Sequence, residues 1–253
     1  MSTTSLKVFL RRLPWLDRRL KRLYYMLREL GERHVIGTRL QEWLWKRRSL
    51  GSGDSTEDEY AESLTHPHRP LLLAAIGEQG PLESILEVGC GPGPNLHLIS
   101  QILPHARLYG IDVNAQALAE GKARFRALGI ENCEFECHNF EALRRYPDHS
   151  IDLVFTNAVL MYAGPDRIRG VLREIVRVAR KAAIFSEWHQ PGEQKHHAGQ
   201  PAARYHYGHW IYDYADLLSE FLTPERVTII RYAEGIWADA NWKAFGCLIV
   251  AKM

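Results

Sequence analysis

The amino-acid sequence predicts an α/β fold in which a mostly parallel β-sheet is covered by helices on both faces. Short apolar runs rich in Ile, Val, Leu and Phe recur along the chain as ILEVG, RLYGID, CEFECH, DLVFTN and AAIFSE. Helical segments separate most of these runs, and such alternation is typical of a parallel sheet. The runs are continuously apolar, as expected for strands buried on both faces. Two further strands are predicted near Val227–Arg231 and Phe245–Ala251.

Length and composition are those of an ordinary globular protein. The chain has 253 residues, 46% hydrophobic and 25% charged, which suffices for one large domain and an appendage. No apolar run approaches the roughly 20 residues that span a bilayer, and the first residues lack the pattern of a secretory signal. We therefore expect a cytoplasmic protein. The four cysteines show no C-x-x-C spacing, so free thiols are expected and no metal site is predicted.

Residues 1–50 are predicted to form a basic, amphipathic helical extension. Residues 1–48 carry 13 Lys and Arg against 4 Asp and Glu. Pro14 fits the first turn of the main helix, and a second helix is expected over Thr38–Arg48. An apolar stripe with spacings of three and four is formed by Leu6, Phe9, Leu13, Leu16, Leu20, Leu23, Leu27 and Leu30.

Three roles stay open for this extension. The simplest is an amphipathic helix that packs on its own domain. A Leu/Trp stripe flanked by Arg and Lys is also typical of a helix on a membrane surface, which would make the protein peripheral to the inner face of a membrane. The repeat also permits a homodimer contact through residues 6–48.

The remaining chain divides into a connection and a large domain. Residues 51–66 are predicted to be a linker or lid, because GSGDSTEDEYAES is rich in Gly, Ser and acidic residues. Residues 67–253 are predicted to form the α/β domain. Within it, residues 190–218 are interpreted as an insertion that covers the substrate.

A glycine-rich turn carries the strongest chemical signal. The apolar strand ILEV runs into Gly89, Gly91 and Gly93, with Glu87 near the strand end, and a helix is expected over Asn95–Leu103. Glycines at these positions let the backbone turn sharply and approach a ligand closely. The helix that follows offers free N–H groups at its start. The dinucleotide pattern G-x-G-x-x-G would need a glycine at position 94, where this chain has proline, which disfavours NAD or FAD.

Asp112 ends the next predicted strand, 21 residues beyond Gly91. A carboxylate at this place can accept hydrogen bonds from both hydroxyls of a ribose. Asp112 could instead cap the helix expected near Ala115–Leu128. We favour the ribose contact.

Taken in order, ILEVGCGPGPNL, YGIDVN, CHNFEAL and DLVFTNAVLMY resemble the class I S-adenosylmethionine-dependent methyltransferases, over residues 68–253. The resemblance implies a doubly wound, seven-stranded, Rossmann-like sheet whose last hairpin is reversed, which agrees with the two late strands. It also implies S-adenosylmethionine as cofactor.

The resemblance also assigns cofactor contacts. It places the methionine part of the cofactor at the turn from Glu87 to Gly93, and the ribose at Asp112. Asn139 and Phe140 stand beside the adenine, where the family usually has an acidic residue. The amide oxygen of Asn139 can accept the same hydrogen bond, and Phe140 could either pack on the ring or fill the core. Asn157, at the end of the fourth strand, is expected to complete the cofactor site.

The acceptor side should lie at the ends of the fourth and fifth strands. Tyr162 follows the fourth strand, and Glu187 and His189 end the fifth. The carboxyl ends of parallel strands are where this class of sheet places function. His189 is the first choice for a general base, because the ordinary pKa of histidine suits that role near neutrality. The chain lacks the N/D-P-P-Y/F motif of enzymes that methylate base amino groups.

The insertion at 190–218 and its flank are rich in imidazole and aromatic groups, which could stack on and hydrogen-bond a sugar ring. The alternative is a solvated loop before a helix over Trp210–Phe221. No ordered set of three ligands with a carboxylate emerges, so no metal is predicted. The residues concerned are His189, His196, His197, His206, His209, Tyr205, Tyr207, Trp210, Tyr212 and Tyr214.

The sequence therefore predicts a methyltransferase that acts on a small molecule or carbohydrate, at oxygen. Two alternatives stay open. An RNA or protein methyltransferase could use the basic extension to hold a polyanion, but the net acidic remainder of the chain disfavours nucleic acid. A non-catalytic protein that binds S-adenosylmethionine is disfavoured by the intact Glu87, glycine turn and Asp112.

Overall fold

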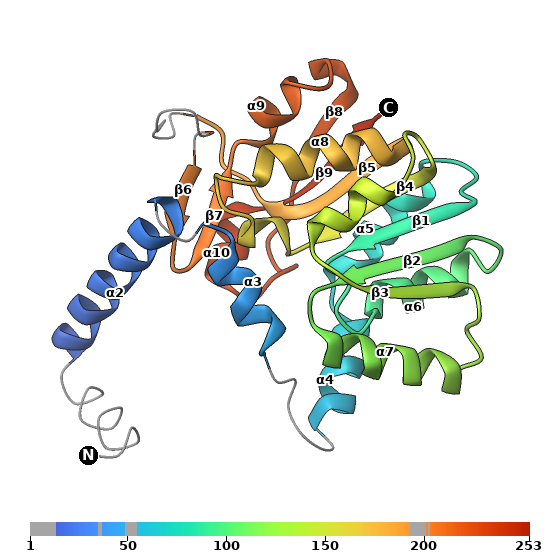
Figure 1. Ribbon diagram of the computed structural model, residues 1–253, viewed down its shortest axis with the longest axis horizontal. Helices are drawn as coiled ribbons and strands as arrows, with labels where there is room; N and C mark the ends of the chain where they lie inside the picture. Colours follow the sequence, from blue (N-terminus) through green and yellow to red (C-terminus); the bar gives the residue numbers. More distant parts are fainter. Residues whose placement is uncertain (1–13, 35–36, 49–54, 193–200, 202) are drawn as a thin grey trace.

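The computed structural model describes the chain except for residues 1–13, 35–36, 49–54, 193–200 and 202. Leu6, Phe9, Leu13, His196 and His197 lie outside the described residues. Figure 1 shows the arrangement of the elements. The helices are α2 (Pro14–His34), α3 (Arg39–Lys46), α4 (Ser55–Leu64), α5 (His68–Gly77), α6 (Pro94–Ile102), α7 (Ala115–Ala127), α8 (Ile168–Val178), α9 (Tyr214–Ser219) and α10 (Ala240–Phe245). The strands are β1 (Ser84–Val88), β2 (Arg107–Asp112), β3 (Cys133–Cys137), β4 (Ile151–Asn157), β5 (Ala179–Trp188), β6 (Ala203–His206), β7 (His209–Tyr212), β8 (Val227–Arg231) and β9 (Gly246–Lys252).

Seven strands form one sheet in the order β3-β2-β1-β4-β5-β9-β8. The first five run parallel, whereas β9 is antiparallel to both β5 and β8. The predicted doubly wound, seven-stranded sheet with a reversed last hairpin is thus confirmed. The strand order reverses at β1, which lies between β2 and β4. In open α/β sheets such a reversal opens a crevice at the carboxyl ends of the strands.

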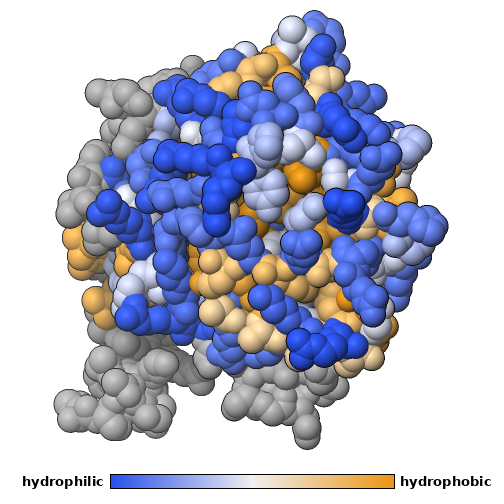
Figure 2. All heavy atoms as spheres, turned by 45° about the vertical axis from the view of Figure 1, so that its right-hand side comes forward, coloured by the Kyte–Doolittle hydropathy of each residue, from blue (hydrophilic) through white to orange (hydrophobic). Residues whose placement is uncertain are grey.

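Both faces of the sheet are covered, as the continuous apolar strands predicted. On one face, Leu86 and Val154 belong to a core that includes Leu172 of α8. On the other, Ile85 and Phe155 belong to a core shared with α5, α6 and α7. On the side of the molecule in Figure 2, hydrophilic side chains predominate and hydrophobic ones gather only in limited groups. Among the described residues, no helix combines the length and hydropathy needed to cross a bilayer.

The segment expected to be a linker is largely helical. Helix α4 occupies most of residues 51–66, and its Tyr60 is buried. The Tyr60 hydroxyl lies 3.2 Å from Nδ1 of His97 in α6, and the Arg124 guanidinium lies 3.8 Å from the centre of the Tyr60 ring. Most of the segment predicted to be a linker or lid is therefore helical, and its Tyr60 packs on the domain.

The insertion at 190–218 is also built differently from the expectation. One alternative was a helix over Trp210–Phe221. The structure instead has a hairpin of β6 and β7 up to Tyr212, and a helix begins only at Tyr214. Trp210, Tyr212 and Tyr214 are fully buried. These three aromatic side chains join the core beside α8 and are not available to stack on a sugar.

Candidate functional site

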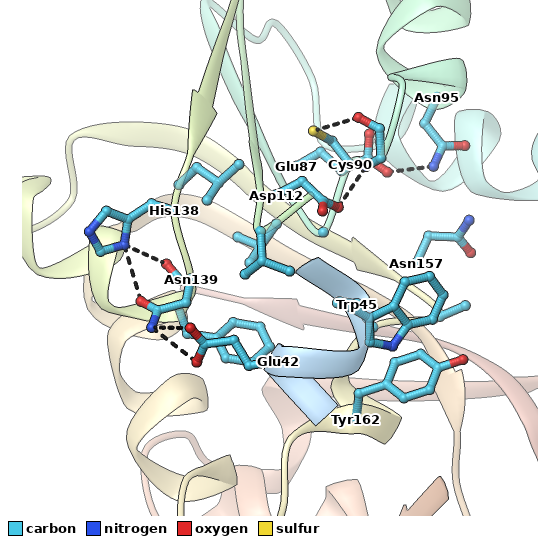
Figure 3. A pocket seen from close by; sticks show the side chains of 18 of the residues that line it. Glu42, Trp45, Glu87, Cys90, Asn95, Asp112, His138, Asn139, Asn157 and Tyr162 are labelled. Atoms are coloured by element: carbon cyan, nitrogen blue, oxygen red, sulfur yellow. Dashed lines mark hydrogen bonds between the residues drawn. The ribbon is translucent and has the colours of Figure 1, made fainter. Parts of the chain in front are cut away.

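A cavity of about 260 Å³ opens at the carboxyl ends of β1, β2 and β4, where the strand order reverses. Figure 3 shows the polar side chains that converge on it. The sequence-predicted residues that line it are Glu87, Gly89, Gly91, Asp112, Asn139, Phe140, Asn157 and Tyr162. The fold therefore brings together eight of the residues singled out from the sequence.

The glycine-rich turn has the backbone that its residues predict. Gly89, Gly91 and Gly93 have φ of +80°, +54° and +81°, a region that side chains disfavour. A Cβ on Gly89 would overlap the Val159 side chain, so glycine is required there for space as well. A Cβ on Gly91 would meet nothing within 4 Å, so the backbone at this position is open for close approach by a ligand. Gly93 is absent from the cavity wall and caps the start of α6 instead.

Glu87 is a buried carboxylate at the end of β1. Its Oε1 accepts a 2.6 Å hydrogen bond from Nδ2 of Asn95 in α6, and Arg69 of α5 donates to Oδ1 of the same asparagine. Its Oε2 is buried and has no hydrogen-bond partner within the described part of the chain. Burial raises the pKa of Glu87 to about 8, while Asn95 and Arg69 oppose the rise. An unpaired carboxylate oxygen of this kind suits a cationic or N–H-bearing ligand group.

Asp112 links β2 to the glycine turn. Its Oδ2 accepts a 2.8 Å hydrogen bond from the Gly91 N–H, and its Oδ1 accepts one of 2.8 Å from the Asn114 N–H. Burial raises the pKa of Asp112, and these backbone donors oppose the rise. Helix α7 is capped by Asn114, whose Oδ1 accepts from the N–H groups of Gln116 and Ala117. Asp112 is thus free of the capping role that was its alternative.

Asn139 lies across the cavity from the glycine turn, as Figure 3 shows. Its Oδ1 accepts a 3.0 Å hydrogen bond from the Glu141 N–H, and its Nδ2 lies 3.2 and 3.3 Å from the two carboxylate oxygens of Glu42 in α3. Asn139 stands where the family usually has an acidic residue, and its amide binds the carboxylate of Glu42, which comes from α3. The pKa of Glu42 is lowered, because hydrogen bonds from Lys46 and Asn139 outweigh the effect of burial.

Helix α3 forms one wall of the cavity. Thr38, just before it, and Gln41, Glu42 and Trp45 within it all line the space. The sequence indicated an amphipathic helix here but not this contact with the site. The extension at α3 thus packs on its own domain, the simplest of the three roles considered.

Two sets of hydrogen bonds hold α3 against the domain. The Asp166 carboxylate accepts from the Thr38 N–H at 3.2 Å and from the Thr38 hydroxyl at 2.8 Å, and that hydroxyl accepts from the Gly164 N–H at 2.8 Å. At the other end, Nδ2 of Asn114 donates to the Trp45 carbonyl at 3.2 Å and to the Arg48 carbonyl at 2.9 Å. Asn114 therefore ties the cap of α7 to the wall of the cavity.

Asn157 and Tyr162 mark the end of the cavity beyond β4. Asn157 Oδ1 is buried without a partner in the described structure, and its Nδ2 lies 3.3 Å from Nε2 of His68. The ring centres of Tyr162 and Trp45 are 4.9 Å apart in an edge-on contact, and both rings border the space beside Asn157 in Figure 3. Burial raises the pKa of Tyr162, so its phenol is neutral at pH 7.

Glu187 and His189 do not line this cavity. Oε1 of Glu187 accepts from the Thr156 hydroxyl at 2.9 Å and from two N–H groups of the turn after β4 at 3.0 Å. Nδ1 of His189 accepts a 3.1 Å hydrogen bond from the Tyr214 N–H, and burial lowers the pKa of His189. Both side chains support backbone turns, so the catalytic roles predicted for them gain no support from their positions.

Several residues of the site escaped the sequence analysis. Asn95 of α6 donates to Glu87, and Arg69 of α5 donates to Asn95. Glu42 and Trp45 come from the extension. A polar residue at the start of the helix after a glycine turn, such as Asn95, is a local signal that could have been used. Glu42 and Trp45 carry no such signal, because only the tertiary structure brings α3 to the sheet.

Comparison with known proteins agrees with this geometry. A family model described as a methyltransferase domain matches residues 85–182, from β1 to the start of β5. The trans-aconitate 2-methyltransferase of Escherichia coli strain 55989 is 31% identical over 94 residues, which are 36% of this chain and 33% of that protein. The chain therefore spans about a third of the length of the curated relatives that it matches.

Solved structures show the same fold over a larger part of the chain. The geranyl diphosphate C-methyltransferase of Streptomyces coelicolor A3(2), solved with Mg²⁺, geranyl diphosphate and S-adenosyl-L-homocysteine, covers 85% of this chain with a TM-score of 0.59 and 15% identity; 97% of that chain is covered. A SAM-dependent methyltransferase of Aquifex aeolicus covers 76% of this chain with a TM-score of 0.52 and 19% identity; 95% of that chain is covered.

Proposed function

We propose that the chain, whose residues 85–182 match a methyltransferase domain, is a class I S-adenosylmethionine-dependent methyltransferase that transfers a methyl group from S-adenosylmethionine to a small-molecule acceptor, at oxygen. One observation carries the proposal. The open glycine turn, Glu87 and Asp112 all line one cavity at the point where the strand order reverses, and one carboxylate oxygen of Glu87 is buried without a partner among the described residues.

The residues present fit this cofactor. The unpaired Oε2 of Glu87 suits the cationic amino group of the methionine part. The open backbone at Gly91 allows close approach of the same part. Asp112, on the neighbouring strand, can accept hydrogen bonds from ribose hydroxyls. Asn139, Phe140 and the Glu42 carboxylate then border the purine, where an exocyclic amino group needs an acceptor.

When bound, S-adenosylmethionine supplies a methyl group on a positively charged sulfur, which is already a good leaving group. The protein then has to hold the acceptor in line and keep water away. Tyr162 and Asn157 lie at the end of the cavity beyond β4, where they can orient an acceptor hydroxyl. The phenol oxygen of Tyr162 can accept the hydrogen bond of the acceptor hydroxyl, which leaves a lone pair of the acceptor oxygen free to attack the methyl group. The hydroxyl proton is then released to solvent as the new C–O bond forms and the bond from sulfur to the methyl group breaks.

The acceptor is proposed to be a small molecule, since the curated relatives are named for trans-aconitate and a structural neighbour for geranyl diphosphate. A carbohydrate acceptor has less support, because three of the aromatic residues expected to stack on it, Trp210, Tyr212 and Tyr214, are buried in the core; Tyr207 is exposed. Helix α3 forms a wall of the cavity. This position weakens the alternative of an RNA or protein substrate held by the extension.

Cofactor binding and turnover test this proposal directly. Titration calorimetry with S-adenosylhomocysteine should show binding, and replacement Asp112→Ala should weaken it at least about tenfold, because a hydrogen bond to a charged group contributes about 1.5–3 kcal/mol. The control Asp216→Ala removes an exposed carboxylate of α9 and should leave the affinity unchanged. Equal affinities in all three proteins would contradict the assignment of the site. Methyl release from labelled cofactor over candidate acceptors then tests the reaction itself.

We also propose that α2 places this enzyme at an anionic membrane surface, on the cytoplasmic face. Figure 1 shows α2 projecting from the domain, with its C-terminal end beside β6 and β7. Six large apolar side chains of α2 are exposed: Leu20, Leu23, Tyr24, Met26, Leu27 and Leu30. A helix that presents apolar residues next to an excess of Arg and Lys has the properties of an interfacial membrane helix.

A further inference from the structure

A second cavity adjoins the cofactor cavity. It has a volume of about 360 Å³ and lies between α2, α3 and the hairpin of β6 and β7. Gln41, Trp45 and Tyr162 line both cavities. An acceptor in the second cavity would therefore meet the cofactor site beside the Trp45 and Tyr162 rings.

Two arginines and no acidic residue line this second cavity within the described residues. The Arg48 guanidinium lies 4.5 Å from the centre of the Trp45 ring, and Arg48 has no ion pair with any described residue. Arg28 donates from Nε to Glu32 at 2.8 Å. A positive charge with no acidic partner at the mouth of a cavity attracts an anion.

The Glu32 carboxylate pairs with Arg28 and offsets one of the two positive charges, so the site keeps the charge of Arg48. This carboxylate is buried, and besides Arg28 it accepts hydrogen bonds from Gln41 at 2.9 Å, from Tyr205 at 3.0 Å and from Trp210 at 3.2 Å. Glu32 thus fixes the end of α2 on the hairpin. Through Nε, it also holds Arg28 in place at the cavity wall.

The charge of both arginines reaches the shared wall. Arg48 and Arg28 each oppose the rise that burial causes in the pKa of Tyr162. His209, which also lines the second cavity, has its ring centre 5.1 Å from that of Tyr162. Planar guanidinium groups bind carboxylate and phosphate oxygens through paired hydrogen bonds.

We propose that the second cavity binds an oxyanion group of the methyl acceptor, a carboxylate or a phosphate, between Arg28 and Arg48. This inference rests on the proposed function and adds the substrate class to it. The anionic group at the arginines leaves the remainder of the acceptor to reach past Tyr162 into the cofactor cavity. Acceptors without such a group lack the contact that holds them in this position.

The test is a calorimetric titration of the full chain saturated with S-adenosylhomocysteine. The probes are citrate for carboxylates, pyrophosphate for phosphates, and uncharged triethyl citrate. We expect citrate or pyrophosphate to bind and triethyl citrate not to bind. Whichever oxyanion binds more tightly identifies the source of the negative charge.

Two matched variants locate the binding. Replacement Arg48→Gln should weaken oxyanion binding at least about tenfold, as expected for the loss of a charge-assisted hydrogen bond. Replacement Arg47→Gln removes the same charge from the adjacent residue, whose guanidinium lies over Trp43 and does not line the cavity, and should leave the affinity unchanged. Equal weakening in both variants would show a general effect of charge and would overturn the proposal.

The two proposals fail in distinguishable ways. If S-adenosylhomocysteine binds but neither oxyanion binds at millimolar concentration, the oxyanion site is refuted and the methyltransferase proposal stands. If S-adenosylhomocysteine does not bind, the methyltransferase proposal fails, and the same titrations on the cofactor-free protein decide whether the arginines bind an oxyanion.

Discussion

Two carboxylates, Glu87 and Asp112, end neighbouring strands of the sheet and have different partners. Asp112 accepts two backbone N–H groups, whereas one oxygen of Glu87 has no partner within the described residues. Glu87 is consequently the carboxylate whose ionisation depends most on what enters the cavity. Burial raises its pKa to about 8, from an ordinary value of 4.5.

This raised pKa predicts a pH-dependent affinity for the cofactor. Without ligand, Glu87 is mostly protonated at pH 7, and binding of a cationic amino group favours its charged form. Binding therefore releases a proton, and the affinity for S-adenosylhomocysteine should rise as the pH increases from about 6 to about 8. Above about pH 8 Glu87 is already charged in the free protein, so the rise should level off there.

Calorimetry at several pH values, in buffers with different heats of ionisation, measures the affinity and the released proton together. The variant Glu87→Gln serves as the control: it cannot ionise, so its affinity should be lower and should not rise over this range. A wild-type affinity that stays constant from pH 6 to 8 would show that Glu87 does not meet the amino group.

At the scale of the element, α3 is the least expected part of the site. Its residues line the cavity although it precedes the α/β domain in the sequence. It is held by Asp166 at its start and by Asn114 at its end. A helix held by a few hydrogen bonds can move away more easily than a strand of the sheet. We therefore expect the cofactor to leave when α3 moves away from the cavity.

We therefore predict that Asp166→Ala speeds cofactor release several-fold. Asp166 accepts hydrogen bonds from both the N–H and the hydroxyl of Thr38. Each of these bonds stabilises α3 in its place against the cavity by about 1 kcal/mol, and the replacement removes both. Stopped-flow measurement of S-adenosylhomocysteine dissociation gives the rate. The control is Asp148→Ala, which removes a carboxylate paired with Arg177 on the surface. If both variants release the ligand at the wild-type rate, α3 does not control release.

At the scale of the whole molecule, the N-terminal part of α2 projects from the domain (Figure 1). Its C-terminal part is attached through Arg28, Glu32 and Arg33, and Arg33 donates to the Ala203 carbonyl at 3.3 Å. Its exposed apolar residues lie N-terminal to most of these contacts. This arrangement leaves a helix face available to a surface outside the molecule (Figure 1).

The membrane proposal predicts that the double replacement of Leu23 and Leu27 by Ser weakens binding to vesicles that contain phosphatidylglycerol. A fully buried Leu contributes about 1.5–3 kcal/mol, so partial burial of two should change the affinity at least about tenfold. Vesicle sedimentation measures the effect. The control Leu128→Ser alters a similarly exposed leucine after α7 and should bind as wild type. If the wild-type protein does not bind these vesicles and is dimeric by light scattering, the membrane proposal is contradicted and a homodimer contact through the extension is favoured.

The sequence by itself determined the sheet, the glycine turn and the two carboxylates that follow β1 and β2. These features depend on local signals, because apolar strands, positive φ at glycine and residues at strand ends are set by nearby positions. The two late strands predicted from their apolar runs are present as β8 and β9, which pair with each other.

Only the tertiary structure decided which residues share a cavity. Glu42 and Trp45 reach the site from a helix far away in the sequence, while the aromatic residues of β7 turn into the core and His189 accepts a hydrogen bond from the Tyr214 backbone. The identities of these residues are compatible with either role, since a tryptophan or histidine can pack in a core or face a ligand. The packing of distant elements decides between the two, and that packing is a property of the whole chain.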